Sequence, residues 1–387
     1  MANNKNIKVP NVPNLRFPIF TDKWEAGKLD EYILLVSGQD LSPEQYTDKE
    51  DVYPYITGAS SLNSEGIILN RWIHTPTQIV KRGDILLVCK GSGVGQLTVL
   101  SNIDKAHIAR QIMGIRANNA ESQLFIYHYL SRLMTELKKR STGIIPGIDR
   151  KSILSLHISI PSLQEQQKIA KFLNLIEQRI ITQSKIIEDL KKLKSAIIEK
   201  LYSDIQGKEY SYRQLFEVVN ERNKQMEYSN ILAASQEKGM VSRDDLNLDI
   251  QFERSNINTY KIVREGDYVI HLRSFQGGFA FSNKTGVCSP AYTILRPNAL
   301  LEYGYLSYYF MSYRFIKSLI IVTYGIRDGR SISVEEWLNL KISIPFKEHQ
   351  LHILKVLRSF DWKIENEEAY ATHLSNQKQY LLRQMFI

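Results

Sequence analysis

Side chains that can form directed hydrogen bonds to DNA bases occur on predicted loops in both halves of the chain. Arginine, lysine and glutamine can bond the major-groove edges of purines, and serine or threonine can bond several bases. The candidates are Thr57, Ser60, Ser61, Lys90, Ser92, Gln96, Arg110 and Gln111 in the first half, and Gln236, Lys238, Arg273, Ser274, Gln276, Lys284, Arg327 and Arg330 in the second. We expect some of them to contact only phosphate, which positions a protein without reading sequence.

The charge of the chain also favours a polyanionic partner. Its formal net charge is +9 and its isoelectric point is about 9.2, and a basic excess attracts phosphate backbones over long range. An apolar content of 43% and a charged content of 24% are ordinary for a soluble globular protein. The polar start of the chain and the lack of a long apolar run predict neither a signal peptide nor a membrane span, so we expect a cytoplasmic protein.

Motifs for catalysis are missing from the sequence. The glycine-rich run Gly91–Gln96 follows a strand-like segment but lacks the lysine of a phosphate-binding loop, so it favours a tight turn whose backbone can also approach DNA. No Pro-Pro dipeptide is present, although amino-methyltransferases of DNA need a short Pro-Pro-aromatic motif. Glu136-Leu137-Lys138 imitates part of a nuclease signature but lies in a helical stretch. Cys89 and Cys288 have no paired base and show no metal spacing, which favours core positions.

The elements that must position the candidate residues are repeated along the chain. Leu156–Pro161 returns as Leu340–Pro345, at an offset of 184 residues, and each copy leads into a turn that ends at Gln166 or Gln350. Apolar residues then recur at alternating steps of four and three. They are Ile169, Leu173, Ile176, Ile180, Ile187, Leu190, Ile197 and Leu201 in the first copy, and Ile353, Leu357, Phe360, Ile364, Ala371, Leu374, Leu381 and Met385 in the second.

Such a stripe is typical of a coiled-coil helix, whose apolar seam must be covered by another helix. The simplest partner for each seam is the other one. We therefore predict two long helices, from about Ser162 to Ser203 and from about Lys347 to Ile387, which pair antiparallel around an internal two-fold axis. Polar residues interrupt the two stripes at matching positions, namely Gln183 and Glu367, and Lys194 and Lys378.

The regions before each helix mix strand-like and helical patterns. Strand-like runs occur at residues 53–56, 67–69 and 84–89 and again at 267–272, and helical stretches occur near residues 124–138 and 303–317. We predict an α+β fold in which two mixed α/β domains are separated by the two antiparallel helices. The predicted segments are residues 1–160 for the first domain, 161–205 for the first spacer helix, 206–345 for the second domain and 346–387 for the second spacer helix.

Inside the two domains the repeat is looser. Gly83-Asp84 matches Gly266-Asp267, and Gly143-x-x-x-Gly147 matches Gly325-x-x-x-Gly329, while the residues between diverge. A shared scaffold with unlike surfaces is expected if the two domains read different targets, although duplication followed by drift would look similar. Gly207 is predicted to be a hinge after the first long helix. The lysines of that helix are interpreted as a solvated face, which could also touch DNA backbone, and they are Lys191, Lys192, Lys194 and Lys200.

These features together resemble the specificity subunits of type I restriction-modification systems. The resemblance rests on two variable domains, each followed by an Ile-Ser-Ile-Pro-x3-Glu-Gln-Gln-type start of a long helix, and on the opening Pro13–Pro18 with Trp24 and Lys28-Leu29. It covers essentially the whole chain. The second helix start reads Pro345–Gln350 with its acidic residue shifted by one position, which we interpret as drift.

The resemblance implies a DNA-binding subunit without catalysis of its own. Its two target-recognition domains would each read one half of a bipartite, asymmetric site in double-stranded DNA. Two methyltransferase subunits would dock on the helices and two restriction-translocase subunits would complete the complex. S-adenosylmethionine, ATP and magnesium would be bound by these partners, and no cofactor or metal by this chain.

The length of the helices sets the expected spacing of the two half-sites. The stripe from Ile169 to Leu201 extends roughly 48 Å at about 1.5 Å per residue. One turn of B-DNA is about 34–36 Å, so the half-site centres are predicted about ten base pairs apart. Two other hypotheses stay open. A DNA enzyme with fused recognition domains would modify or cut DNA as the purified chain alone. A two-lobed coiled-coil scaffold would show no salt-dependent affinity for DNA.

Overall fold

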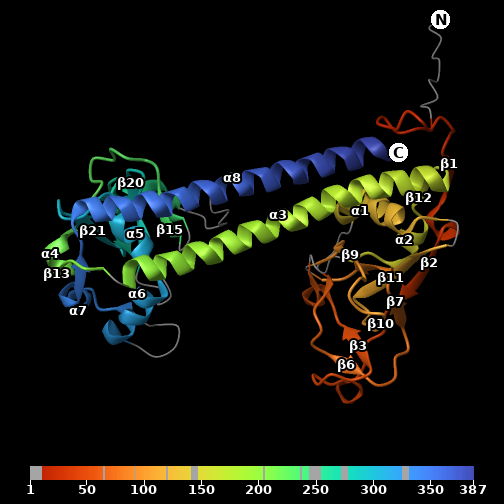
Figure 1. Ribbon diagram of the computed structural model, residues 1–387, viewed down its shortest axis with the longest axis horizontal. Helices are drawn as coiled ribbons and strands as arrows, with labels where there is room; N and C mark the ends of the chain where they lie inside the picture. The colour runs from red at the N-terminus through yellow and green to blue at the C-terminus, as the bar shows by residue number, and fades with distance from the viewer. Residues whose placement is uncertain are drawn as a thin grey trace, which may run out of the picture. The chain divides into compact units, whose positions relative to one another are not determined.

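The computed structural model describes residues 11–63, 66–91, 93–118, 121–140, 147–203, 205–235, 238–243, 254–271, 278–324 and 331–387. The chain divides into two compact units. Unit 1 comprises Met1–Lys185 and Glu368–Ile387, and unit 2 comprises Ile186–Glu367. Each of the long helices α3 (Leu163–Ser203) and α8 (Lys347–Met385), drawn in Figure 1, has one part in unit 1 and the other part in unit 2.

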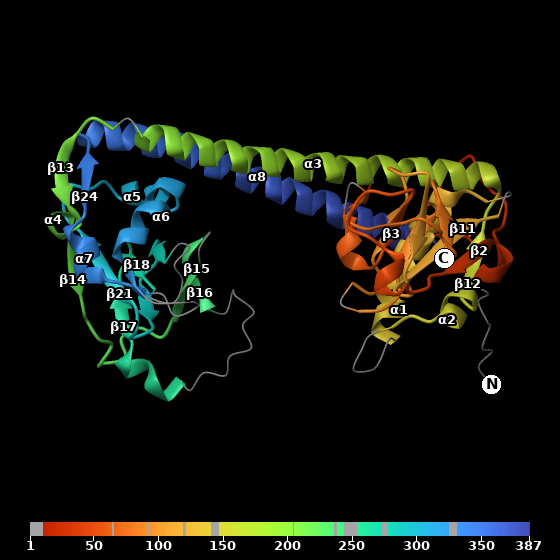
Figure 2. The same ribbon diagram turned by 90° about the horizontal axis from the view of Figure 1, so that it is seen from below.

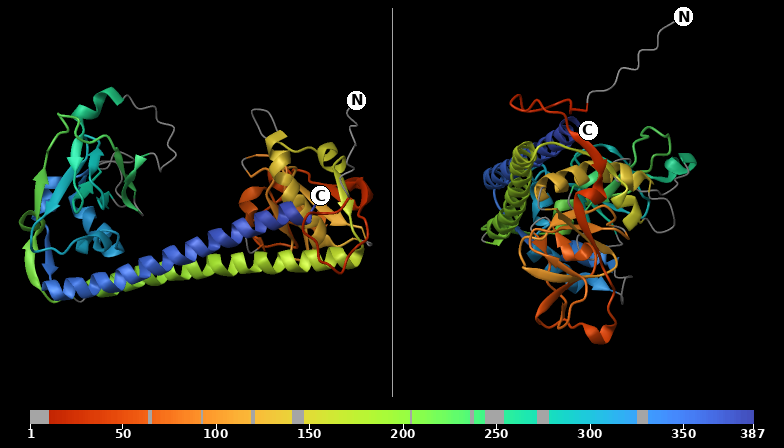
Figure 3. Two further views of the ribbon diagram at one scale, coloured as in Figure 1. Left: turned by 90° about the horizontal axis from the view of Figure 1, so that it is seen from above. Right: turned by 90° about the vertical axis from the view of Figure 1, so that its right-hand side faces the viewer.

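Two four-stranded sheets lie among the described residues of unit 1. The strands of this unit are coloured from red to yellow in Figure 3. The antiparallel sheet has the order β2-β11-β8-β9, and the other sheet has the order β6-β3-β10-β7 with β3 and β10 parallel. The strands of the first are β2 (Ile33–Ser37), β8 (Ile85–Val88), β9 (Leu97–Val99) and β11 (Ile112–Ala117), and those of the second are β3 (Tyr53–Ile56), β6 (Trp72–Ile73), β7 (Ile79–Lys81) and β10 (Lys105–Ile108). Further pairs are β1 (Glu25–Lys28) with β12 (His157–Ile160), and β4 (Leu62–Asn63) with β5 (Gly66–Ile67).

Strand β8 is buried on both faces, which explains its continuous run of apolar residues. Ile85 and Leu87 face a core that includes α1 (Gln123–Arg140), α2 (Arg150–Leu154) and the unit 1 parts of α3 and α8, while Leu86 and Val88 face a core between the sheets. Strands buried on both sides lose the alternation of apolar and polar residues. The predicted strand at residues 84–89 is thereby confirmed.

Unit 2 repeats this plan. In its described part, β14 (Phe216–Val219), β21 (Thr293–Pro297), β18 (Tyr268–Ile270) and β19 (Phe279–Phe281) form an antiparallel sheet in that order (Figure 2). The paired strands beside it are β13 (Lys208–Ser211) with β24 (Lys341–Ile344), β15 (Leu232–Ser235) with β16 (Gly239–Ser242), β17 (Lys261–Val263) with β20 (Gly286–Cys288), and β22 (Thr323–Tyr324) with β23 (Ser331–Ile332). The short helices are α4 (Tyr212–Leu215), α5 (Tyr305–Tyr309), α6 (Tyr313–Ser318) and α7 (Val334–Asn339).

The repeated Gly-Asp pair begins the central hairpin of each unit. Asp84 is buried and bonds the Arg116 guanidinium of the neighbouring strand at 2.7 and 2.6 Å. Asp267 is buried in the same way and bonds Arg296 at 2.9 and 3.0 Å. A bidentate pair of a buried carboxylate and an arginine fixes both strands relative to the turn. The pair therefore belongs to the shared scaffold of the two units.

The repeated glutamine joins the start of each long helix to its own domain. Gln166 Oε1 accepts a hydrogen bond from Ser122 N at 2.9 Å, and Gln350 Oε1 accepts one from Glu302 N at 2.8 Å. In both copies Nε2 donates to the carbonyl oxygen of the proline five residues earlier, at 3.0 Å. Both side chains are buried. The glutamine satisfies backbone groups that would otherwise be buried without partners.

The two long helices lie side by side and antiparallel within each unit. In unit 1 the first part of α3 packs on the last part of α8, and in unit 2 the last part of α3 packs on the first part of α8. The predicted stripe is buried or half-buried along both helices. The predicted antiparallel pairing is thereby confirmed, together with the α+β fold and its internal two-fold repeat.

A lysine that interrupts the apolar stripe forms a polar cluster in each unit. In unit 1, Lys378 Nζ on α8 and the Tyr127 hydroxyl on α1 both lie 2.8 Å from Glu177 Oε1 on α3. The matching cluster of unit 2 has Lys194 on α3 and Tyr308 on α5 bonded to Asp361 on α8. The side chain of Lys194 is only 16% exposed, which corrects its interpretation as part of a solvated face. Such interhelical pairs fix the register of two helices, because any shift would bury their charges without partners.

The two helix starts differ for a structural reason. Glu165 at the start of α3 is 1% exposed, and its carboxylate accepts bonds of 2.7 and 2.6 Å from the Arg16 guanidinium. The segment that carries Arg16 also bonds the end of α8, since Leu15 N donates to Gln384 O at 2.8 Å. The acidic residue of the first helix start thus anchors the segment of unit 1 that precedes β1.

Three local predictions differ from the structure. The helical stretch predicted at residues 303–317 is broken into α5 and α6, because the Ser312 side chain caps the start of α6 by accepting a bond from Phe315 N. Of the strand predicted at residues 67–69, only Ile67 lies in a strand, which is β5 (Gly66–Ile67). Gly207 is no hinge: a Cβ atom there would lie 2.3 Å from Ile344 O, so glycine permits a close approach of two backbones.

A buried histidine makes the stability of unit 1 depend on pH. His128 on α1 is 0% exposed, and neither ring nitrogen has a hydrogen-bond partner among the described residues. Burial lowers the pKa of His128 to about 4. The charge of Glu177 on α3 acts to raise this pKa, and the charge of Lys378 on α8 acts to lower it. Between pH 4 and 6.5 the unfolded chain therefore binds a proton that the folded chain does not, so stability falls with falling pH.

We expect unit 1 to be less stable at pH 5 than at pH 8 by about 2 kcal/mol from this histidine alone. The measurement is hydrogen exchange of the α1 amides at both pH values, corrected for intrinsic rates. The variant His128→Phe should lose this part of the pH dependence, which separates it from other titrating groups. If His128→Phe showed the same difference in stability between pH 5 and pH 8 as the wild type, the assignment of this pH dependence to His128 would be wrong.

Candidate nucleic-acid interface

The candidate residues of unit 1 gather around the tip of the β8–β9 hairpin. Val88 N donates to Gln96 O at 2.9 Å and Gly95 N donates to Val88 O at 2.8 Å, so the loop between these strands is tightly closed. Gly91 and Gly95 have φ angles of 87° and 81°, which glycine adopts without strain. A Cβ atom on Gly93 would lie 2.3 Å from Ala59 Cβ, so this loop packs directly against the residues that follow β3.

The turn between β10 and β11 joins the same cluster. Cys89 N donates to Gln111 O at 2.8 Å, and Ala109 N donates to Ile56 O at 2.9 Å. The side-chain oxygen of Gln111 lies 2.8 Å from the position that a Cβ atom would take on Gly58. The structure therefore brings residues 57–61, 90–91, 93–96 and 109–111 together, and we call them the tip cluster.

Exposure separates the members of the tip cluster. Ser60, Lys90, Arg110 and Gln111 are exposed, while Thr57 and Gln96 are half-buried. Ser61 is only 1% exposed, and its hydroxyl lies 3.3 Å from Thr57 Oγ1. Its place inside the loop corrects the prediction for Ser61, because a buried hydroxyl that stabilises the turn cannot reach a base.

Two candidate residues of unit 2 lie at the other end of the matching hairpin. The β18–β19 hairpin is closed at its base by Gly266 N, which donates to Ser282 O at 2.8 Å. Lys238 lies beside this base, because a Cβ atom on the adjacent Gly239 would be 2.4 Å from Phe281 O, and Lys284 follows β19 there. Both lysines are exposed, but they do not occupy the place that the tip cluster has in unit 1.

Several predicted positions lie outside the described residues. Among the candidates for DNA contact they are Ser92, Gln236, Arg273, Ser274, Gln276, Arg327 and Arg330, and among the repeated glycines they are Gly143, Gly325 and Gly329. All of them stay predictions.

Asp40 lies beside the tip cluster, and the sequence does not single it out. Its Oδ1 accepts a bond from Arg110 N at 3.1 Å, and its Oδ2 lies 2.6 Å from Arg110 Nε. The two residues are far apart in sequence, and Asp40 follows a strand without any repeated motif. Only the pairing of β2 with β11 brings them together.

Cys89, Cys288 and His107 are buried side chains of the core. Burial raises the pKa of the Cys89 thiol, and it raises the pKa of Cys288 to about 12, so neither thiol is a nucleophile at neutral pH. Burial lowers the pKa of His107, whose Nδ1 accepts bonds from Thr77 N and Gln78 N. Across the described part of the chain, no three histidine, cysteine or acidic side chains lie where they could hold a metal ion.

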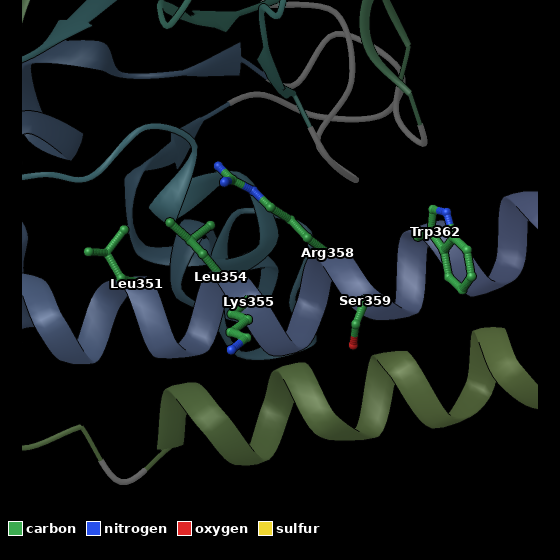
Figure 4. Close-up of a pocket in the computed structure, with 6 residues that line it drawn as sticks. All are labelled: Leu351, Leu354, Lys355, Arg358, Ser359 and Trp362. Carbon is green, nitrogen blue, oxygen red and sulfur yellow. The ribbon is translucent and has the colours of Figure 1, made fainter.

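The long helices carry large apolar side chains on their exposed sides. In unit 2, Leu351 is 50% exposed and Trp362 is 67% exposed, and they border a shallow hollow on α8 together with Leu354, Lys355, Arg358 and Ser359 (Figure 4). Further exposed apolar residues along the two helices are Phe172, Leu175, Ile186, Leu193, Tyr370 and Tyr380. The hollow with its exposed Leu351 and Trp362 is therefore a candidate site of interaction with another protein or ligand. None of the helices in the described residues could cross a membrane.

A family model places the chain in a class of DNA specificity proteins. The model for the type I restriction modification DNA specificity domain matches residues 21–192 and 207–374, which is most of the chain. The chain therefore belongs to the family of type I restriction-modification specificity subunits, and it has two target-recognition domains.

Individual relatives agree with this family. The chain is 25% identical to the type I restriction enzyme MjaVIII specificity subunit of Methanocaldococcus jannaschii, over 95% of this chain and 92% of that protein. A crystal structure of the type I restriction-modification S subunit from M. genitalium has a TM-score of 0.56 at 16% identity and covers 97% of this chain and 99% of that chain. A protein from a structural study of complex assembly and conformational transition of the type I system has a TM-score of 0.58 at 16% identity, over 93% and 96% of the two chains.

Proposed function

We propose that this chain selects the DNA site of a type I restriction-modification complex. Each target-recognition domain reads one half of a bipartite, asymmetric sequence in double-stranded DNA. The observation that carries the proposal is the tip cluster, where exposed Lys90, Arg110 and Gln111 are held on tightly bonded loops. Rigid polar side chains of these types are suited to the major-groove edges of bases.

The division of labour follows from the surfaces of the chain. The exposed apolar residues of α3 and α8 support docking of partner subunits on the helices, and we propose two methyltransferase and two restriction-translocase subunits as these partners. S-adenosylmethionine, ATP and magnesium are then bound by the partners. This chain itself carries out no catalysis in the proposal. A cytoplasmic location is expected for such a complex.

Mapping of methylated adenines in cells tests this function. The chain is expressed with its methyltransferase subunits in cells free of other adenine methylation, and the modified sites are sequenced. We expect one bipartite, non-palindromic motif with half-site centres about ten base pairs apart. A continuous or palindromic motif would contradict the proposal.

A binding measurement separates the proposed function from a scaffold role. Affinity of the complex for random duplex DNA is measured at two salt concentrations. A DNA-binding chain loses affinity steeply with salt, because binding releases counterions from phosphate. Affinity that does not change with salt would favour the scaffold, and modification of DNA by the purified chain alone would favour a self-contained enzyme.

A further inference from the structure

The loop that carries Asp40 is anchored on both sides to buried groups. Before Asp40, Gln39 N donates to Ile108 O at 2.9 Å, and Gln39 O lies 2.8 Å from His107 Nε2. Since Nδ1 of His107 already accepts two backbone N–H groups, Nε2 carries the proton and donates to Gln39 O. After Asp40, Leu41 N donates to the hydroxyl of buried Tyr55 at 3.3 Å.

Close backbone packing holds the same loop against Arg110. A Cβ atom on Gly38 would lie 2.0 Å from Ala109 O, so only glycine permits the approach of this loop to the β10–β11 turn. Gly38 N also donates to Ile112 O at 3.1 Å. Asp40 therefore has little freedom to move away from Arg110.

The ion pair between Asp40 and Arg110 contributes little to stability. The two side chains are 47% and 69% exposed, and exposed pairs of this kind are worth about 0–1 kcal/mol. Its effect is on geometry instead. With Nε beside Asp40 Oδ2, the two terminal amino groups of the guanidinium form the edge that remains for a ligand. Two parallel donors of this kind match O6 and N7 of guanine.

The charge of Asp40 also discriminates between a base and a phosphate. A phosphate bound by the Arg110 guanidinium would be held close to the Asp40 carboxylate, and like charges at short range repel. The guanine edge offers two neutral acceptors and no such repulsion. In the part of the chain that the structure describes, Asp40 is the only ion-pair partner of Arg110.

We propose that Arg110 reads a guanine in the half-site of the first target-recognition domain and that Asp40 is the residue that positions it. This inference rests on the proposed function and adds to it the identity of one base. Arg110 belongs to the tip cluster and Asp40 lies beside it, and Lys90 and Gln111 of the same cluster are exposed.

The test maps the methylation motif of complexes assembled with variant chains. Arg110→Ala should lower the preference for guanine at one position by about 10- to 100-fold and leave the other half-site unchanged. Arg110→Lys should weaken the same preference, because a lysine ammonium lacks the planar pair of donors that Asp40 orients, and it should keep its affinity for random duplex. Asp40→Asn should weaken the preference at the same position and leave the affinity for random duplex unreduced.

Arg82→Ala is the matched control. Its guanidinium also bonds an exposed aspartate, with Nε 2.9 Å from Asp104 Oδ1, but this pair lies at the base of the hairpin. The control should leave the motif unchanged, and thermal melting confirms that all variants fold. An unchanged motif with Arg110→Ala would overturn the inference, as would an equal loss of affinity for every sequence, which marks a phosphate contact. A wild-type complex that methylates no bipartite site would overturn the proposed function itself.

Discussion

Reversing the charge of Lys378 with Lys378→Glu is expected to destabilise unit 1 by about 3–5 kcal/mol, the range found when a buried ion pair loses one partner. The Lys378 and Glu177 side chains are 18% and 20% exposed, and the substitution places two carboxylates together between α3 and α8. Tyr127 cannot relieve the repulsion, because its hydroxyl already donates to Glu177. Urea unfolding combined with hydrogen exchange of the α1 and α3 amides measures the loss.

A second substitution makes this prediction specific to the pair. Glu177→Lys in the same chain restores opposite charges in the reverse orientation, so the double variant should recover most of the lost stability. Lys185→Glu, on the exposed side of α3 in the same unit, is the control and should leave unit 1 unchanged. A double variant as unstable as Lys378→Glu alone would show that the pair does not hold the helices together.

Removing the arginine that bonds the repeated aspartate is expected to cost about 3 kcal/mol in either unit. Arg116→Met leaves the carboxylate of Asp84 buried with only 4% exposure, and Arg296→Met leaves that of Asp267 with 2%. A buried carboxylate without its partner keeps the cost of leaving water and loses the compensating attraction. The loss should appear in the exchange of β8 and β11 amides for the first variant, and of β18 and β21 amides for the second.

The control for this prediction is an exposed pair in the same hairpin. Arg82 bonds Asp104, but the two side chains are 57% and 85% exposed, so Arg82→Met should change stability by no more than about 0.5 kcal/mol. Equal effects of Arg82→Met and Arg116→Met would contradict the structural role assigned to the buried aspartate.

The repeated parts of the fold were predictable because they obey short periods. The apolar stripe of each long helix depends only on residues three and four apart, and its duplication indicated the antiparallel partner. The polar interruption at Lys194 was visible too, but not its partner. The ion pair with Asp361 joins two different helices, so periodicity along one helix cannot show it.

The candidate site was predictable only in part. Loop positions beside strand ends brought Lys90, Arg110 and Gln111 onto one surface, as the sequence pattern suggested. Asp40 was missed because its role depends on sheet pairing between distant segments. Ser61 was misjudged because exposure of a serine in a turn depends on how the loop folds onto itself. In both cases tertiary packing decides which side chains are exposed and which partners they meet, and residue type alone does not predict this.

The discontinuous build of unit 1 has a consequence for synthesis on the ribosome. Its core includes Leu381, Leu382, Met385 and Phe386, which lie about 200 residues after Lys185 along the chain. At translation rates of about 5–20 residues per second, these residues emerge roughly 10–40 s after the rest of the unit. During that interval the nascent polypeptide exposes the apolar side of α3 that α8 later covers. Chaperones that shield such surfaces, or slow production in the cold, should therefore raise the yield of correctly folded protein.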